Sequence, residues 1–293
     1  MKRKISNFLF NYWWLLLIFF YVAVLWVYFF WIGTGSLAAA YFRESSVFRL
    51  AGTLFVFYLP AAAGHYFVTN WYVLKINKIR KIKDKHERLR QAEALLKAYV
   101  MDQNDNDMPS SQIKAKVVVF YFIAIYLMSD FEDYPAALDY FGCAITLSAR
   151  LKAMPDELTS YNIKNQCHIW EAVTLALTGD ASAETKIEPF IQRMSKLNEW
   201  DRSGVWLARI VIAIKQDDIA AARKHHKNFD ILIRELAVKS KRPDLIYDSI
   251  LYDGILDKME GNLDLSRQKL EDVLQNATDE GNRLRAKKEM PCL

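Results

Sequence analysis

The sequence predicts an all-α protein in which two N-terminal transmembrane helices precede a helical domain. Three observations support this fold class. Two long stretches near the start are almost free of charge, and a run of lysines and arginines follows the second stretch. In the rest of the chain, sequence patterns typical of helices alternate with short polar turns. Of the 293 residues, 52% are hydrophobic and only ten are glycine, a composition that fits one large helical domain or two smaller ones.

The first elements are a short basic N-terminus, residues 1–8, and a transmembrane helix over residues 9–32. No residue from 9 to 32 carries a formal charge. At about 1.5 Å per residue the helix is long enough to cross ~30 Å of hydrocarbon, and tryptophans and tyrosines near both ends suit the headgroup level. A cleaved signal peptide ending near Ala38–Ala40 is the alternative, but signal cores are typically only ~7–15 residues long.

A second transmembrane helix is predicted over residues 50–74, after a short external loop at 33–49. Pro60 removes one backbone donor and predicts a bend, which neighbouring helices in a membrane can accommodate. The small residues that end at Gly64 allow another helix to approach closely, and His65 is an ionisable group within the span. These three residues are the expected contact with the first helix or with a membrane-protein partner.

The distribution of lysine and arginine predicts the orientation. Three of these residues precede the first span, eight fall within residues 75–90, and two lie in the loop between the spans. Positively charged flanks stay in the cytoplasm, so both termini are expected there and the chain is expected to be a multi-pass protein of the cell membrane.

Residues 75–101 are predicted to form a basic juxtamembrane helix that continues from the second span, because isoleucines recur there every three residues. Each exposed cation near the membrane attracts anionic lipid by about 1 kcal/mol. The expected lipid-facing residues are Lys75, Lys78, Arg80, Lys81, Lys83 and Lys85. Nucleic acid is not an expected partner, since residues 91–293 sum to −5 and would repel phosphate.

A polar linker at 102–109 separates this segment from a helical domain at 110–280. Its spaced Asp and Asn residues do not form a calcium loop, because Asp107 stands where glycine is needed and Ile113 where glutamate is needed. Either Ser110 or Ser111 is the expected cap of the next helix. Residues 281–293 are predicted to be a C-terminal tail.

The helical domain shows recurrent turns. At Phe131–Phe141 (FEDYPAALDYF) a polar turn is followed by a small residue and then by an aromatic residue, and this resembles the second half of a tetratricopeptide repeat. Similar turns at Gly179–Asp180, Gln216–Asp218 and Gly261–Ser266 imply four helix pairs. Their spacing exceeds the family's ~34 residues, so a generic α-solenoid of helical hairpins is the alternative.

The resemblance implies binding of a protein or peptide partner, because known relatives mostly bind such partners. The leading helix of each pair is expected to line the concave surface of a stacked array. The candidate contact residues on these helices are Tyr121, Trp170, Trp206 and Arg209.

The sequence shows none of the searched motifs for phosphate, zinc or nucleophilic chemistry, and it predicts neither an enzyme nor a cofactor or metal site. His225 and His226 are adjacent, so on a helix they point about 100° apart and are interpreted as part of a solvated face. Cys167 and His168 are also adjacent, so on a helix they point about 100° apart and cannot act together as a nucleophile and its base. Three cysteines in all are too few for a disulfide framework.

The expected function is therefore that of a membrane-anchored, non-enzymatic adaptor. Two alternatives stay open. The transmembrane hairpin could itself be the active part, in an accessory subunit of a transport or envelope-assembly complex. The helical domain could instead be a regulator that responds to a peptide.

Overall fold

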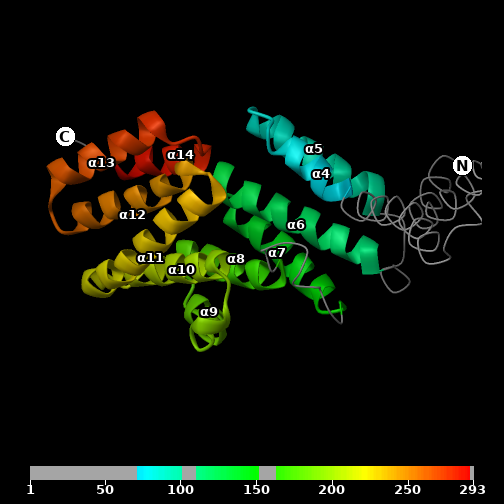
Figure 1. Ribbon diagram of the computed structural model, residues 1–293, viewed down its shortest axis with the longest axis horizontal. Coiled ribbons are helices and arrows are strands. Elements are labelled where there is room, and N and C mark those ends of the chain that lie inside the picture. The colour runs from blue at the N-terminus through cyan, green and yellow to red at the C-terminus, as the bar shows by residue number, and fades with distance from the viewer. Residues whose placement is uncertain (1–70, 101–109, 152–162, 291–293) are drawn as a thin grey trace, which may run out of the picture. The chain divides into compact units, whose positions relative to one another are not determined.

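The structure is a computed structural model that describes residues 71–100, 110–151 and 163–290. The chain divides into two compact units, Met1–Lys75 and Ile76–Leu293, and nearly all described residues belong to the second. Every regular element in the described ranges is a helix, which confirms the all-α prediction there (Figure 1). In chain order the α-helices are α4 (Trp71–Ile79), α5 (Lys85–Val100), α6 (Ser110–Asp130), α7 (Tyr134–Ser148), α8 (Ile163–Thr178), α9 (Ser182–Ile191), α10 (Glu199–Lys215), α11 (Ile219–Ser240), α12 (Ile246–Met259), α13 (Leu263–Asn276) and α14 (Glu280–Glu289). Short 3₁₀ turns, η3 (Met194–Lys196) and η4 (Pro243–Leu245), precede α10 and α12.

The predicted membrane segments fall outside the described residues. These are the N-terminus at 1–8, the spans at 9–32 and 50–74 except for Trp71–Leu74, and the loop at 33–49. The linker at 102–109 is also outside, as are Pro60, Gly64 and His65. Among the helices that the structure describes, none is both long and apolar enough to cross a membrane.

The predicted basic helix over 75–101 is two helices. It ends at Ile79 and restarts at Lys85, with a turn between α4 and α5. Asp84 explains the restart, because its carboxylate accepts a hydrogen bond from the amide of Glu87 at 2.6 Å, as a residue at the start of a helix does. The isoleucine spacing predicted one continuous helix and not this break, and Ile76 and Ile79 are buried on α4.

All four predicted turns between paired helices are present. In each turn one residue adopts a positive φ angle, and an aspartate or asparagine follows it. The pairs are Glu132 (52°) with Asp133, Gly179 (79°) with Asp180, Asp217 (60°) with Asp218, and Gly261 (82°) with Asn262. The carboxylates of Asp133 and Asp218 accept hydrogen bonds from the amides of Ala136 and Ala221, so they cap the second helix of their pairs.

The four turns join α6 to α7, α8 to α9, α10 to α11 and α12 to α13, and the helices of each pair pack against each other. A core of buried aliphatic and aromatic side chains runs from α8 to α14. Small residues allow the helices to approach closely, since Ala172, Ala208 and Ala222 are fully buried. The described domain is thus a series of helical hairpins, a pattern compatible with a helical solenoid.

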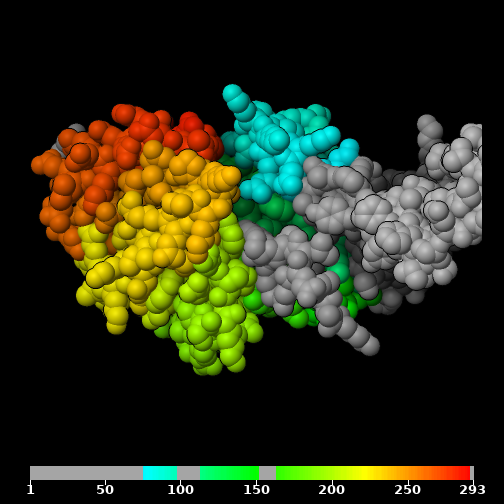
Figure 2. All heavy atoms as spheres, viewed as in Figure 1, coloured from blue at the N-terminus to red at the C-terminus, as the bar shows by residue number. Residues whose placement is uncertain are grey.

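The second hairpin is unequal. Its second helix, α9, is short and projects from the lower edge of the array in Figures 1 and 2. Ala183, Ile187 and Phe190 form its buried stripe against the core. The shortness of α9 agrees with the weaker match of this turn to the tetratricopeptide pattern.

The predicted C-terminal tail at 281–293 is mostly a helix. α14 begins at Glu280 after the cap residue Asp279, and it packs against α12, α13 and the end of α6. Gly281 marks the closest approach, because a Cβ atom there would lie 2.5 Å from the carbonyl oxygen of Ser129. A larger residue would push α14 away from α6.

Polar contacts dominate the docking of α14, which buries only Gly281 and Ala286. Its side chains reach α12 and the turn after α6. Asn282 donates to Asp248 at 2.6 Å, Arg285 donates to the hydroxyl of Tyr252 at 2.8 Å, and the ion pairs are Lys288 with Glu132 and Lys258 with Glu289. The last helix is therefore tied to both the first and the last hairpin.

Lowering the pH from 7 to 5 is expected to strengthen this docking through Asp248. Burial raises the pKa of Asp248 to about 6; Asp279 and Asp244 act in the same direction, while Asn282 and Arg242 oppose them. Because the pKa of this carboxyl is higher in the folded than in the unfolded chain, its protonated form stabilises the fold. This stabilisation is fully present below the unfolded-state pKa and is lost as the pH rises through 6. The expected gain in unfolding free energy between pH 7 and pH 5 is about 1 kcal/mol.

The measurement is urea unfolding of the wild type and of Asp248→Asn at both pH values. The difference between the two proteins cancels the opposing effect of His168 and His225, whose lowered pKa values make the folded state lose stability as the pH falls. An equal pH response in both proteins would show that Asp248 keeps its ordinary pKa.

Candidate partner-binding site

Two of the four predicted contact residues belong to a polar network around Gln166 in α8. The side-chain oxygen of Gln166 accepts from the indole N–H of Trp170 at 2.9 Å and from the hydroxyl of Tyr121 at 3.5 Å. Its amide donates to Asp201 at 2.5 Å, and Asn165 donates to the same carboxylate at 2.8 Å. Burial raises the pKa of Asp201, against these hydrogen bonds. The network joins α6, α8 and α10.

The structure corrects the role expected for Tyr121. Its side chain is only 2% exposed, so it packs inside the domain and cannot contact a partner. Trp170 is partly buried and packs against the core. The physical reason is that both helices have neighbours on several sides: α6 packs against α5, α7, α8 and α14, and α8 packs against α6, α7, α9 and α10. A leading position in a hairpin therefore did not guarantee exposure.

The other two predicted residues do come together. The guanidinium of Arg209 lies over the ring of Trp206, 5.4 Å from its centroid. This is cation–π geometry between two residues one turn apart on α10. Both residues are partly exposed, although Trp206, like Trp170, also packs against the core with part of its ring. A flat aromatic surface with a positive charge on it is therefore accessible on the central leading helix.

His225 completes this aromatic group from α11. Its ring centroid lies 5.7 Å from that of Trp206, and the residue is 9% exposed. Burial lowers the pKa of His225 to about 4, with Arg209 and Lys224 acting in the same direction and Asp218 opposing them. The imidazole is thus neutral at pH 7, and its buried Nδ1 atom has no hydrogen-bond partner.

The interpretation of His225 and His226 as a solvated face was wrong. Both are buried, because α11 packs against α10 on one side and α12 on the other. The Nε2 atom of His226 lies 2.9 Å from the carbonyl oxygen of Ser249 and 3.1 Å from its hydroxyl. This histidine is therefore a packed core residue with hydrogen-bond partners, in contrast to His225.

Arg202 is a functional candidate that the sequence argument missed. It lies four residues before Trp206 and seven before Arg209, so all three share one stripe of α10. Its buried Nε atom has no hydrogen-bond partner. The spacing of these residues was visible in the sequence and could have identified Arg202. The Arg202–Trp206–Arg209 set with His225 is called the α10 stripe below.

The basic segment divides into two groups. Lys75, Lys78, Lys81 and Lys83 are exposed, whereas Lys85 turns inward and donates to the carbonyl oxygen of Asp130 at 3.0 Å.

Arg80 also departs from the expected lipid-facing role. It is exposed as a residue, but its guanidinium lies over the ring of Phe122, 5.4 Å from the centroid. Arg88 pairs with the carboxylate of Asp130 at 2.7 Å. These inward contacts hold α5 and the turn before it against α6.

The remaining reactive groups lie in packed positions. Cys167 is fully buried, and burial raises the pKa of its thiol, as expected for an inert core cysteine. Burial lowers the pKa of its neighbour His168, whose ring lies 6.2 Å from that of Phe190. Within the described ranges, no group of histidine, cysteine and acidic side chains is arranged to hold a metal ion.

No family model, curated protein or solved structure matches this chain. The α10 stripe and the hairpin array that presents it are therefore the features of the described structure that bear on function.

Proposed function

We propose that this chain is a membrane-anchored, non-enzymatic adaptor whose tetratricopeptide-like domain binds a protein or peptide partner at the cytoplasmic face of the cell membrane. The observation that carries the proposal is the α10 stripe. Trp206 and Arg209 form a partly exposed aromatic and cationic surface on a central helix of the hairpin array. Tryptophan and arginine are the residues most often responsible for binding energy in protein interfaces.

The membrane part of the proposal is supported by the sequence. The apolar stretches at 9–32 and 50–74 precede the array, and the exposed lysines of α4 and the turn after it follow the second stretch directly. Such lysines suit anionic headgroups and a cytoplasmic position. A partner held on α10 would therefore be kept near the bilayer.

The test is affinity capture of the full-length chain from membranes in mild detergent, with co-purifying proteins quantified by mass spectrometry, and a separate alkaline wash of the same membranes tests whether the chain itself is anchored. We expect the double substitution Trp206→Ala with Arg209→Ala to lower recovery of the specific partner at least about ten-fold, since both residues are typical binding hot spots. Thermal unfolding must show that the variant still folds. Ile231→Ala, at a 53% exposed position on α11, is the control and is expected to capture normally.

Two results would count against the adaptor. Release of the chain by the alkaline wash would remove the membrane anchor. Unchanged capture by the double variant, combined with loss of capture in Gly64→Ile, would place the partner on the transmembrane hairpin. The accessory-subunit hypothesis would then replace the adaptor.

A further inference from the structure

We propose that the α10 stripe recognises an acidic, extended peptide segment, with carboxylates on Arg202 and Arg209 and an apolar side chain against Trp206. The inference rests on the proposed function and names the chemistry of the partner. It is argued from the charges, the unpartnered atoms and the spacing of the stripe.

The first argument is that these two arginines lack carboxylates. Some arginines in the described residues form ion pairs, such as Arg88 with Asp130 and Arg234 with Asp230, and others, including Arg80 and Arg193, lie over aromatic rings instead. Neither Arg202 nor Arg209 makes an ion pair or donates a side-chain hydrogen bond within the described residues. A guanidinium presents five donors in a planar fork that matches a carboxylate. The stripe therefore offers two positions for an acidic group from outside.

The second argument is the placement of unpartnered buried atoms. Only five side-chain atoms in the described part of the chain are buried without a hydrogen-bond partner, and two of them belong to the stripe. They are Nε of Arg202 and Nδ1 of His225, whose side chain is almost fully buried beside Trp206. Buried polar groups in folded proteins normally have partners. A bound peptide, rich in carboxylate and backbone groups, can supply both.

The spacing of the stripe fits an extended segment. Arg202 and Arg209 are seven residues apart on α10, which corresponds to about 10 Å along the helix axis. An extended peptide in the polyproline II conformation rises about 3.1 Å per residue with three residues per turn, so acidic residues three positions apart lie on one face and reach both arginines. The side chain between them then lies against Trp206. One turn of the partner is enough to occupy the stripe.

A short acidic segment fits better than a long polyanion. Residues 91–293 sum to −5, and Asp218 lies close enough to His225 to affect its pKa. A nucleic acid would extend past the stripe and meet this negative charge, whereas a few carboxylates would not. The unpaired arginines are thus a local positive site on an acidic domain.

The test uses the full-length chain in mild detergent and fluorescence anisotropy with a short fluorescein-labelled peptide in which two glutamates, three positions apart, flank two leucines. The comparison probes are the same peptide with glutamines and a single-stranded oligonucleotide of similar charge. We expect the glutamate peptide to bind at least about ten-fold more tightly than the glutamine peptide, because charge-assisted hydrogen bonds are roughly twice as strong as neutral ones. Tighter binding of the oligonucleotide than of the glutamate peptide would overturn the proposal.

The variants locate the binding. Arg202→Gln and Arg209→Gln are each expected to weaken binding of the glutamate peptide at least about ten-fold. Lys215→Gln removes the same charge from an exposed position at the end of α10, on another face of the helix, and is expected to change binding less than two-fold. Equal losses for all three variants would show that the peptide responds to net charge only, and the stripe would be refuted as its site.

The failure of this inference is distinguishable from that of the proposed function. If the glutamate and glutamine peptides bind alike while native capture still depends on Trp206 and Arg209, the adaptor stands and its partner is not acidic. If both results fail, the stripe binds nothing and the adaptor falls as well.

Discussion

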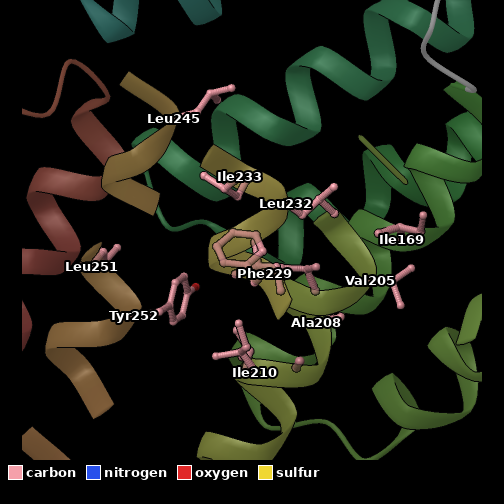
Figure 3. Packing of buried hydrophobic residues seen from close by; sticks show 14 of the residues in the cluster. Ile169, Val205, Ala208, Ile210, Phe229, Leu232, Ile233, Leu245, Leu251 and Tyr252 are labelled. Atoms are coloured by element: carbon pink, nitrogen blue, oxygen red, sulfur yellow. The ribbon is translucent and has the colours of Figure 1, made fainter. Parts of the chain in front are cut away.

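Replacing Phe229 by alanine is expected to lower the free energy of unfolding by about 3–5 kcal/mol, as measured by urea unfolding of the full-length chain. Phe229 lies on α11 and is 2% exposed. Figure 3 shows its ring at the centre of the cluster, among side chains from α10, α11 and α12. Because three helices meet on this ring, the cavity left by alanine cannot collapse without moving a whole hairpin.

Ile231→Ala is the matched control for this prediction. It lies two residues along the same helix but is 53% exposed, so its truncation is expected to change stability by no more than ~0.5 kcal/mol. The contrast separates burial from helix propensity, because both substitutions place alanine in the middle of α11. Similar losses in the two variants would show that the cluster does not unfold as one unit with the rest of the domain.

The hairpin turns could be predicted from the sequence because their cause is local. A helix that ends in a residue with positive φ and restarts at an aspartate or asparagine leaves a short recognisable signal, as at Asp217–Asp218 and Gly261–Asn262. The break at Asp84 carries part of the same signal. Asp84 directly precedes α5, and the acidic residue Glu87 follows three residues later in the first turn of that helix. It was missed because the isoleucine periodicity ran on across it.

Elements that depend on distant contacts could not be predicted. α14 buries little apolar surface, so its sequence resembles a polar tail, and its helix is explained by contacts with α6 and α12. His225 and His226 lie between charged residues in the sequence, but α10 and α12 cover them in the fold. Burial of this kind arises from packing between helices, which a single helix does not show.

The candidate site was predictable in the same partial way. Trp206 and Arg209 were expected on a leading helix, and the structure brings them together. His225 comes from the neighbouring helix and required the packing of α10 against α11. Tyr121 was expected beside them but lies in the interior. The sequence thus placed two of the four candidate residues together on α10 but did not show which helices cover the other two.

Disrupting a charge network on α11, α12 and α13 is expected to have the second large effect on the stability of the protein. The guanidinium of Arg223 contacts Asp253 at 2.5 Å, Glu260 at 2.8 Å and also Asp257. Lys269 reaches Asp253 and Asp257 at 2.6 Å each. The hydrogen bond with Arg223 is the main cause that lowers the pKa of Glu260. Two cations therefore hold three carboxylates that lie on one face of α12.

Arg223→Met is expected to destabilise the protein by about 2–3 kcal/mol in urea unfolding at pH 7. Removing one partner of a buried ion pair typically costs ~3–5 kcal/mol, and partial exposure of Arg223 reduces the effect here. Asp257 determines the size of the loss, because it is only 4% exposed and would keep Lys269 as its single cation. Methionine preserves most of the apolar length of the side chain, so the change reports mainly on charge.

Arg234→Met provides the comparison on the same helix. Arg234 forms an exposed pair with Asp230 one turn away, a geometry worth ~0.3–0.5 kcal/mol. If Arg223→Met cost no more than Arg234→Met, the network would be no stronger than a surface pair. The double variant Arg223→Met with Asp257→Asn tests the cause directly: removing the buried charge is expected to restore much of the lost stability, because the penalty comes from a buried carboxylate left with one cation instead of two rather than from lost packing.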